Sequence, residues 1–203
     1  MIGILDYGMG NLQSVRNSCE YLGEQVTLVN SPAELVKLSK IILPGVGSFS
    51  EGMNNLEQLD LIPALRETVL ERHVPLLGIC LGMQLLADTG TEGGRRSGLG
   101  FIPGVVERFD DSLLRVPHVG WNNIKVLRPN PLLSPEMSVD YYFVHSYFFN
   151  AKKNEDVIAS CEYGIEFPCV VGRRNIFGVQ FHPEKSHKFG LDLLRVFLKI
   201  LPC

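Results

Sequence analysis

The sequence predicts an α/β fold: a single domain with a mostly parallel, doubly wound sheet, helices on both faces and an antiparallel extension. In residues 1–87, short apolar runs alternate with helical periodicity, the rhythm of β-α-β units whose strands pair in parallel. Beyond residue 89, strand-like runs are separated by Pro, Gly and Asn turns, which is typical of hairpins. The length of 203 residues, without an internal repeat or linker, favours one domain over residues 1–203.

The parallel part is expected to come from the first half of the chain. Strands are predicted at residues 2–5, 25–29, 40–43 and 75–79, and a helix at residues 61–73. A further helix over residues 12–22 shows apolar positions at steps of three and four, and Gly23 suits its C-terminal cap. Ser31 and Glu34 form a capping-box pair around Pro32, since proline is favoured at the first position of a helix.

The antiparallel part is expected in the second half, after a polar, glycine-rich loop at residues 92–98. Strands are predicted at residues 105–109, 123–127, 141–149, 157–161, 169–171 and 176–181. A final helix is predicted from about residue 187 to residue 201. Its apolar side is expected to consist of Phe189, Leu193, Val196 and Ile200.

Charge and composition exclude several classes of function. The 19 Lys and Arg residues against 22 Asp and Glu give 19 − 22 = −3, without the basic excess of a nucleic-acid binder. The hydrophobic fraction of 45% belongs to an ordinary globular protein, and no apolar run approaches the ~20 residues of a membrane helix. No leader precedes the first strand, so a cytoplasmic location is expected. The glycine-rich turns lack the dinucleotide and P-loop patterns.

Five cysteines occur at irregular spacing: Cys19, Cys80, Cys161, Cys169 and Cys203. The odd count and the absence of a Cys-x-x-Cys pair favour neither a disulfide framework nor a zinc site. We therefore expect reduced, cytosolic cysteines, among which a single reactive thiol can matter.

The segment Gly-Ile-Cys-Leu-Gly at residues 78–82 lies between an apolar strand and a helical run. It has the pattern of a nucleophile elbow, Gly-x-Ser-x-Gly, with Cys80 in the place of serine. The sharp turn raises the thiol above the sheet edge, where a helix N-terminus favours the thiolate. The backbone N–H of Leu81 is placed to bind a developing oxyanion. The alternative is a buried cysteine that packs as a small hydrophobic residue.

Among the five histidines, His182 is the best candidate for the base of this thiol. It closes an apolar strand and precedes Pro183, which favours an extended backbone. In such a backbone His182 and Glu184 point the same way, so the carboxylate can orient the imidazole. The alternative is a histidine at a strand end beside a solvated glutamate. The order Cys80, His182, Glu184 differs from the nucleophile, acid, histidine order of α/β-hydrolases, which argues against an esterase or lipase.

A second glycine-rich turn, Pro-Gly-Val-Gly at residues 44–47, follows the strand at residues 40–43. Because the C-terminal ends of parallel strands line one crevice, this turn and the elbow are expected to face the same site. The backbone N–H groups of Gly45, Val46 and Gly47 are candidates for the remaining oxyanion donor. An ordinary strand–helix turn is the alternative.

Residues 78–84 (GICLGMQ) and 178–186 (GVQFHPEKS) together resemble the class I glutamine amidotransferases, which use a cysteine–histidine–glutamate triad. Residues 6–11 (DYGMGN), 44–47 (PGVG) and 117–122 (PHVGWN) are similar to one family of this class, the glutaminase subunits of imidazole glycerol phosphate synthases. The resemblance extends from residue 1 to about residue 186 and implies a flavodoxin-like fold. The triad positions show no departure from it.

The resemblance implies that Cys80 attacks the side-chain amide of glutamine, that His182 transfers the proton and that Glu184 orients His182. Ammonia leaves a tetrahedral intermediate, and water then releases glutamate from a thioester. It further implies that Gln84 and Glu92 bind the α-amino end of glutamine. The backbone of three residues is expected to hold the glutamine carboxylate: His145, Ser146 and Tyr147.

The resemblance also implies a partner, a (β/α)8-barrel cyclase subunit that uses the ammonia in histidine biosynthesis, and neither a cofactor nor a metal. Four residues match the subunit interface of the family: Asn11, Trp121, Asn122 and Lys185. For Trp121, the single tryptophan, the alternatives are an interface anchor and a core residue. A chain of 203 residues leaves no room for a synthase domain, which is therefore expected on another chain.

Two other classes of function stay open. A cysteine hydrolase or protease on a similar fold shares the elbow, but it does not require Gly-Met-Gln after it. A non-catalytic binding homologue is expected to lose the cysteine or the His-Pro-Glu segment. Release of glutamate from glutamine by the purified chain separates the three.

Overall fold

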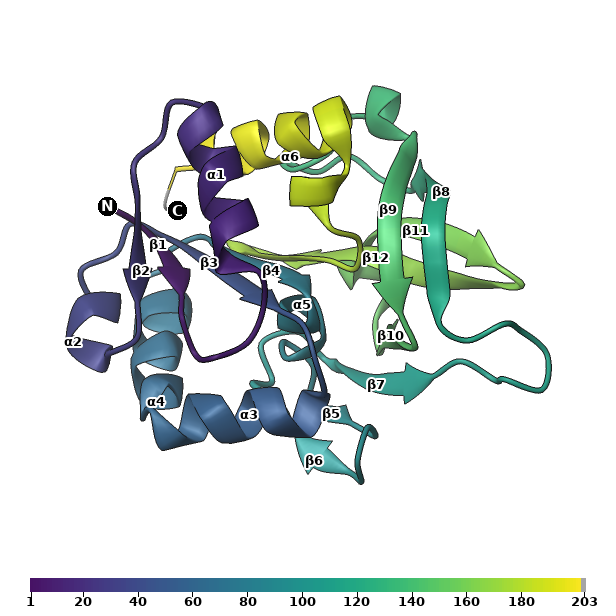
Figure 1. The fold of residues 1–203 in the computed structure, drawn as a ribbon, viewed down its shortest axis with the longest axis horizontal. Helices are drawn as coiled ribbons and strands as arrows, with labels where there is room; N and C mark the ends of the chain where they lie inside the picture. The colour runs from purple at the N-terminus through teal and green to yellow at the C-terminus, as the bar shows by residue number, and fades with distance from the viewer. Residues whose placement is uncertain (202–203) are drawn as a thin grey trace.

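A mixed sheet of nine strands forms the centre of the computed structural model, which describes residues 1–201 (Figure 1). Its parallel half consists of β1 (Ile2–Leu5), β2 (Val26–Val29), β3 (Lys40–Gly45), β4 (Leu76–Cys80) and β13 (Ile176–Val179). These strands lie in the order β2-β1-β3-β4-β13, and neighbours are parallel. Every residue of β1, β3, β4 and β13 is buried, as expected for strands covered on both faces.

The antiparallel half continues from β13. It consists of β12 (Ile165–Arg173), β11 (Val157–Tyr163), β8 (His118–Val126) and β9 (Asp140–His145), in the order β12-β11-β8-β9. Each neighbouring pair in this half is antiparallel. The predicted α/β fold with an antiparallel extension is therefore confirmed, although the extension holds nearly half of the sheet.

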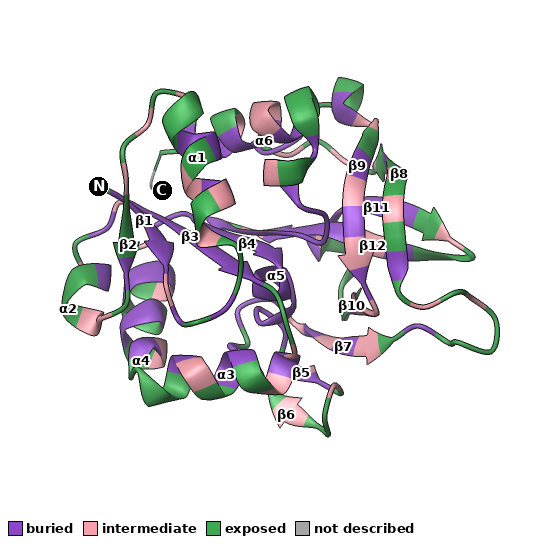
Figure 2. Ribbon diagram, viewed as in Figure 1, coloured by how far each residue is buried: buried purple, intermediate pink, exposed green. Residues whose placement is uncertain are grey.

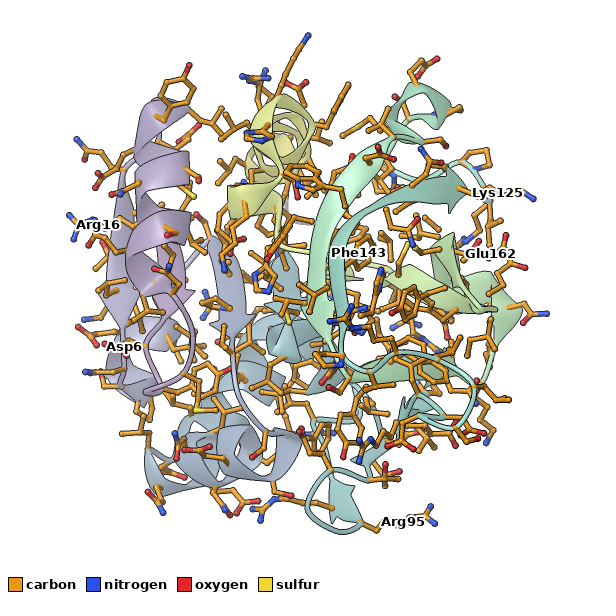
Figure 3. All side chains as sticks on the ribbon, turned by 45° about the vertical axis from the view of Figure 1, so that its right-hand side comes forward. Asp6, Arg16, Arg95, Lys125, Phe143 and Glu162 are labelled. Carbon is orange, nitrogen blue, oxygen red and sulfur yellow. The ribbon has the colours of Figure 1, made fainter. Side chains whose placement is uncertain are left out.

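A second, four-stranded sheet was not predicted. It consists of β10 (Tyr147–Ala151), β7 (Gly104–Arg108), β5 (Thr89–Gly90) and β6 (Arg96–Ser97), in the order β10-β7-β5-β6. The single strand predicted for residues 141–149 is wrong at Ser146, where the chain passes from β9 in the large sheet to β10 in the small one. The hairpin β5–β6 occupies the predicted glycine-rich loop, and Arg95 points outward at its end (Figure 3).

Helices cover both faces of the large sheet (Figure 1). One face carries α1 (Leu12–Tyr21) and α6 (His187–Lys199), which contact each other. The other carries α2 (Pro32–Leu35), α3 (Phe49–Gln58), α4 (Leu61–Arg66) with a π-helical turn (Glu67–Glu71), and α5 (Leu81–Gln84). Short 3₁₀ turns occur at Pro135–Met137, Asn154–Asp156 and Pro183–Lys185.

Each face has its own hydrophobic cluster, and successive strand residues enter different clusters. Ile42 packs with residues of α1 and α6, whereas Leu43 packs with residues of α3 and α4. Figure 2 shows the result as a buried central sheet and helices that are exposed on their outer sides. Within residues 1–201, no helix has the length and apolar character needed to cross a membrane.

Gly23 ends α1 as predicted. It has φ 87°, its N–H donates to the Glu20 carbonyl, and the Glu24 N–H donates to the Cys19 carbonyl, the two bonds of a Schellman cap. Two other predictions at helix and strand ends are wrong. The Ser31 hydroxyl donates to the Glu34 carboxylate at 2.7 Å and makes no hydrogen bond to the backbone of α2, so the capping box does not form. Strand β3 continues two residues further than predicted, to Gly45.

The predicted apolar side of α6 is right for Leu193 but wrong for Phe189, Val196 and Ile200, none of which is fully buried. The buried residues are Gly190, Leu193, Leu194, Phe197 and Leu198. Phe189 is 39% exposed instead of buried. The close contact of Gly190 with the Pro183 carbonyl explains the rotation, because a Cβ at this position would lie 1.9 Å from the carbonyl oxygen.

The cysteines within the described residues are free thiols. Cys19, Cys80, Cys161 and Cys169 are all buried. The last two residues of the predicted domain, Pro202 and Cys203, lie outside the described residues.

Candidate active site

The predicted elbow forms where β4 ends at Cys80 and α5 begins at Leu81. Cys80 has φ 54° and ψ −109°, a conformation that non-glycine residues rarely adopt and that turns the chain sharply. Gly78 and Gly82 allow the close packing of this turn. A Cβ on Gly82 would lie 1.8 Å from the Leu43 carbonyl oxygen, so only glycine fits there without a shift of the backbone.

The helix after the elbow is shorter than predicted. Because α5 has only four residues, it offers Cys80 the free N–H groups of a single turn rather than the dipole of a long helix.

A second hydrogen-bond donor to the Cys80 thiol comes from a residue that the sequence analysis missed. Gln180 is fully buried, and its Nε2 donates to the Cys80 Sγ at 3.7 Å. Its position two residues before His182, on the same side of an extended segment, is the signal that could have found it.

His182 and Glu184 form the predicted pair just after β13. The distance between Nδ1 of His182 and Oε1 of Glu184 is 2.8 Å, and both side chains are almost completely buried. Within residues 1–201, Nε2 of His182 has no hydrogen-bond partner of standard geometry, which leaves this atom for the thiol of Cys80. Burial by itself lowers the pKa of His182, but the interactions with Cys80 and Glu184 outweigh it and raise the pKa to about 9.

A serine that the sequence analysis did not single out holds the turn that carries this pair. The Ser186 hydroxyl donates to the His182 carbonyl at 2.6 Å and accepts from the Tyr142 N–H at 3.0 Å. The His182 N–H in turn donates to the Tyr142 carbonyl. Ser186 thereby fastens the His182 backbone to β9, and its place within the motif at residues 178–186 is the signal that could have indicated it.

A cavity of about 140 Å³ opens beside the thiol. Its lining comprises Cys80 and His182 of the predicted triad and seven further predicted site residues: Val46, Gly47, Leu81, Gln84, Glu92, Ser146 and Tyr147. Val144, which was not predicted, completes the wall, and its carbonyl accepts from the Cys80 thiol at 3.9 Å. The structure thus brings together residues from the turn after β3, from β4, α5, the β5–β6 loop, β9 and β10, and from the segment after β13, while their roles stay predictions.

Glu184 lies behind His182, outside the cavity lining, and two residues predicted to bind the oxyanion or the substrate do not line the cavity either. Gly45 lies one strand away, paired with Cys80 between β3 and β4. His145 is buried behind the wall, where its ring contacts the backbone of Tyr147 rather than the cavity. The turn that follows Gly45 does reach the cavity, because Val46 and Gly47 line it. Gly47 adopts φ 121°, a conformation suited to glycine.

Glu92 has a structural role that the sequence analysis did not foresee, because it missed helix α3. The carboxylate of Glu92 accepts from the Phe49 N–H at 2.8 Å, and the Ser50 hydroxyl donates to the Glu92 carbonyl. A carboxylate at a helix N-terminus is stabilised by the helix dipole. Glu92 is therefore fixed in place as a negative charge at the edge of the cavity.

The four predicted interface residues have different surroundings. Asn11 is the N-cap of α1 and accepts from the Ser14 N–H. Trp121 is 47% exposed, so the alternative of a core tryptophan is wrong, and its ring stacks on His187 at 4.9 Å and 7°. Asn122 follows on the other side of β8, where its amide donates to the Glu162 carbonyl.

Exposed residues around Trp121, together with the half-buried Tyr142, form one surface, here called the Trp121 face. Its members are Val119, Trp121, Tyr142, Lys185 and His187. Tyr142 meets the Trp121 ring edge-on at 5.9 Å, and the Lys185 ammonium lies 5.9 Å from the Tyr142 ring. A groove of about 550 Å³ connects Lys185 and His187 to α1, the helix capped by Asn11.

The fold and the site define a class of protein that comparison with known families confirms. The profile of the family described as glutamine amidotransferase class-I matches residues 3–200. A crystal structure of a glutamine amidotransferase superposes with a TM-score of 0.75 at 22% identity and covers 98% of this chain and 97% of the other. The structure of PurLQS from Thermotoga maritima gives a TM-score of 0.76 at 17% identity over 97% and 96% of the two chains. At these identities the structures share the fold.

Comparison of the sequence narrows the class. The chain is 48% identical to the imidazole glycerol phosphate synthase subunit HisH of Moorella thermoacetica, over 97% of this chain and 93% of the relative. It is 45% identical to the HisH subunit of Leptospira interrogans, over 98% and 100% of the two chains. The chain therefore belongs to the class-I glutamine amidotransferases and, within them, to the family of HisH subunits.

Proposed function

We propose that this chain is the glutaminase subunit of an imidazole glycerol phosphate synthase, and that it passes ammonia to a (β/α)8-barrel cyclase subunit in histidine biosynthesis. The observation that carries the proposal is the buried pair of His182 and Glu184 beside a strained Cys80, with Cys80 and His182 lining one cavity of about 140 Å³. This volume is well below the roughly 300–1,000 Å³ of sites for drug-sized ligands. It suits an amino acid.

The chemistry follows from the protonation of the pair. With the thiol proton on Nε2 of His182, the Cys80 thiolate attacks the side-chain carbonyl carbon of glutamine, and the carbonyl electrons move onto oxygen. The imidazolium then gives its proton to the amide nitrogen, the C–N bond breaks, and ammonia leaves a thioester. Water, deprotonated by His182, attacks the thioester and releases glutamate and the thiol. Glu184 keeps the imidazole oriented and stabilises its positive charge throughout.

The proposed oxyanion donors are the backbone N–H groups of Leu81 and of the turn at Val46 and Gly47, which line the cavity together with the thiol. Gln84 and Glu92 are proposed to bind the α-ammonium group, and the fixed carboxylate of Glu92 supplies the complementary charge. The backbone at residues 145–147 is proposed to hold the carboxylate.

The partner is proposed to dock on the Trp121 face. Strand pairing places Val119 of this face opposite Val144, which lines the reaction cavity, so ammonia released at Cys80 has a short way to this surface. Half-exposed aromatic residues beside a lysine are the composition of an interface centre. The proposed cytoplasmic location rests on the pattern of free cysteines.

Glutamate release by the purified chain, measured with and without a (β/α)8-barrel cyclase subunit, tests the function. The expected result is glutamate production that increases with the partner present. Cleavage of peptides without glutamine hydrolysis would identify a protease instead, and glutamine binding without turnover would identify a non-catalytic homologue.

Replacement of Trp121 by alanine is expected to weaken partner binding by about 2 kcal/mol, or roughly 30-fold in Kd, because it removes the largest exposed ring of the face. Isothermal titration against the cyclase subunit measures this change. The matched control is Leu113→Ala, since Leu113 is 75% exposed in the loop between β7 and β8. An equal loss in both variants would show that Trp121 is not an anchor.

Replacement of Glu184 by glutamine is expected to lower kcat by about 10²-fold and to change the pH profile. Because Glu184 helps to raise the pKa of His182 to about 9, activity in the wild type is expected to fall as pH rises through that value and the imidazolium is lost. Without the carboxylate the pKa of His182 falls, so this basic limb moves to lower pH. The pH dependence of kcat/KM measures the limb, and an unmoved limb would contradict the assignment.

A further inference from the structure

Two buried histidines outside the triad face each other behind the wall of the reaction cavity. His118 on β8 and His145 on β9 are 2% and 6% exposed, and Nδ1 of His118 lies 3.0 Å from Nε2 of His145. The catalytic scheme above uses neither side chain. Such a pair forms a hydrogen bond only if one ring donates and the other accepts, so the orientation of its protons has to be decided by its neighbours.

The Tyr147 carbonyl decides the protonation of both rings. A carbonyl oxygen only accepts, so Nδ1 of His145, at 2.8 Å, has to carry a proton. In a neutral ring Nε2 is then an acceptor, and Nδ1 of His118 has to donate to it. Nε2 of His118 is left as an acceptor and faces the amide Nδ2 of Asn122 at 3.4 Å.

The same carbonyl decides the orientation of two glutamines on its other side. Nε2 of Gln84 donates to the Tyr147 carbonyl at 3.0 Å and to Oε1 of Gln180 at 3.1 Å. Both N–H groups of Gln84 are then used, so the oxygen is the polar atom that Gln84 can offer to the cavity. Because Oε1 of Gln180 accepts, its Nε2 is the atom that faces the Cys80 sulfur at 3.7 Å.

These contacts form one polar network across the molecule. Its members, in order, are Asn122, His118, His145, the Tyr147 carbonyl, Gln84, Gln180 and Cys80. The far end is also held by a backbone acceptor, because Nδ2 of Asn122 donates to the Glu162 carbonyl at 2.9 Å. Figure 3 shows Glu162 toward the outside of the molecule, at the end of β11, and Phe143, which packs on His118, nearer its middle.

The surroundings favour neutral rings. His118 is stacked between Phe143 at 4.9 Å and Tyr163 at 4.0 Å, without a carboxylate among its hydrogen-bond partners. Burial lowers the pKa of His118 to about 4 and that of His145 to about 3. Both histidines are therefore neutral at physiological pH, as the network requires.

We propose that this polar network positions the glutaminase site, with His145 and Gln180 as its positioning residues. Its fixed direction makes Gln84 present an acceptor to the α-ammonium group of the substrate and makes Gln180 present a donor to the thiolate. Reversal of the direction would place a donor against the ammonium and an oxygen against the thiolate, both unfavourable. His145 holds the Tyr147 carbonyl from which the direction originates, and His118 secures His145. The proposal rests on the glutaminase function, and its first test is independent of that function.

The first test is NMR of the whole chain labelled with ¹⁵N-histidine, which distinguishes the two neutral tautomers and the cation. The expected result at pH 7 is the neutral Nδ1–H tautomer for both His118 and His145, with the signals assigned through His118→Phe and His145→Phe. A charged ring or an Nε2–H tautomer at either position would overturn the proposed direction, whether or not the chain hydrolyses glutamine.

The second test separates positioning from folding by kinetics in complex with the cyclase subunit. His145→Phe keeps an aromatic ring but removes the donor, and is expected to raise KM for glutamine about 5- to 10-fold with kcat within about twofold. His145→Asn, whose amide can replace Nδ1 as donor to the Tyr147 carbonyl, is expected to restore most of the affinity. Equal KM values for Phe and Asn variants would overturn the role of His145.

The matched control is Asn175→Ala. Asn175 is equally buried and donates to the carbonyls of Val69 and Val74, away from the cavity, so its loss is expected to lower Tm without changing KM. If Asn175→Ala raised KM as much as His145→Phe, a general loss of stability would explain both. Absence of glutamate release by the wild-type complex would contradict the proposed function. In that case the histidine tautomers measured by NMR would still test the hydrogen-bond direction of the network.

Gln180 is tested by the reactivity of the thiol, without turnover. Gln180→Leu removes the donor at similar volume and is expected to slow alkylation of Cys80 by iodoacetamide at pH 7 about 5- to 10-fold, because the thiolate loses a hydrogen bond. Mass spectrometry of the labelled peptide confines the measurement to Cys80. An unchanged alkylation rate in a folded variant would overturn the role of Gln180.

Discussion

Replacement of Cys80 by alanine is expected to lower glutamine hydrolysis by about 10⁴-fold or more, because no other group at the cavity can form the thioester. The fold is expected to persist. Alanine and cysteine carry the same Cβ, so both meet the same strain at φ 54°. Glutamate release and the circular dichroism spectrum measure the two effects.

The matched control for this variant is Cys19→Ala. Cys19 is also a buried free thiol, but it lies on α1 and does not line the cavity. Its replacement is expected to leave kcat and KM unchanged. Glutamine hydrolysis at the wild-type rate by Cys80→Ala would refute the mechanism, and a parallel loss in Cys19→Ala would mean that the assay reports damage to the core.

The second large effect is expected for Gly82→Ala. The added methyl group would lie 1.8 Å from the Leu43 carbonyl oxygen, which belongs to the backbone of β3 and has no rotamer by which to avoid it. The elbow has to separate from β3, so we expect a loss of about 3 kcal/mol in the free energy of unfolding. The same shift moves Leu81 and the thiol, and is expected to lower kcat by about 10²-fold or more. Urea denaturation and glutamate release measure the two effects.

Gly23→Ala is the matched glycine control. Gly23 has φ 87°, but no atom lies within 4 Å of its ideal Cβ position, so the substitution carries conformational strain without a clash. We expect it to cost about 1 kcal/mol and to leave kcat unchanged. If Gly82→Ala were no worse than Gly23→Ala, the contact with Leu43 would not be what excludes side chains from the elbow.

The parts of the site that the sequence predicted correctly are those in which the chemistry depends on near neighbours. The elbow needs glycine on both sides of Cys80 and a strand before it, all within residues 76–82. His182 and Glu184 are two residues apart, so they can meet locally, but a 3₁₀ turn at Pro183–Lys185, rather than the extended backbone expected from the sequence, brings them to 2.8 Å. The position of the turn after β3, beside the elbow, was predicted because the C-terminal ends of parallel strands lie at the same edge of a sheet.

The parts that the sequence analysis missed depend on contacts between distant segments. Helix α3 has a local signal that was not used, the capping-box spacing of Ser48 and Glu51. The contact of its N-terminus with Glu92, 43 positions from Phe49, depends on the tertiary structure. The break at Ser146 arises because β9 and β10 join different sheets, and their residues are equally strand-like. The Asn122 side chain contacts His118 and the Glu162 carbonyl. Which side of β8 packs against the rest of the molecule cannot be deduced from the residues of this strand alone.

By itself, the sequence determined the order of the first four strands, the elbow at Cys80, the pairing of His182 with Glu184 and the family. Each of these depends on backbone geometry within a few residues, which local residue types decide. Three contacts were decided by the tertiary structure alone. Gln180 donates to the thiol, Ser186 fastens His182 to β9, and Nδ1 of His118 donates to Nε2 of His145. Those contacts join residues up to 100 positions apart. The hydrogen-bond direction of those made by Gln180 and by the two histidines follows from one backbone carbonyl, that of Tyr147.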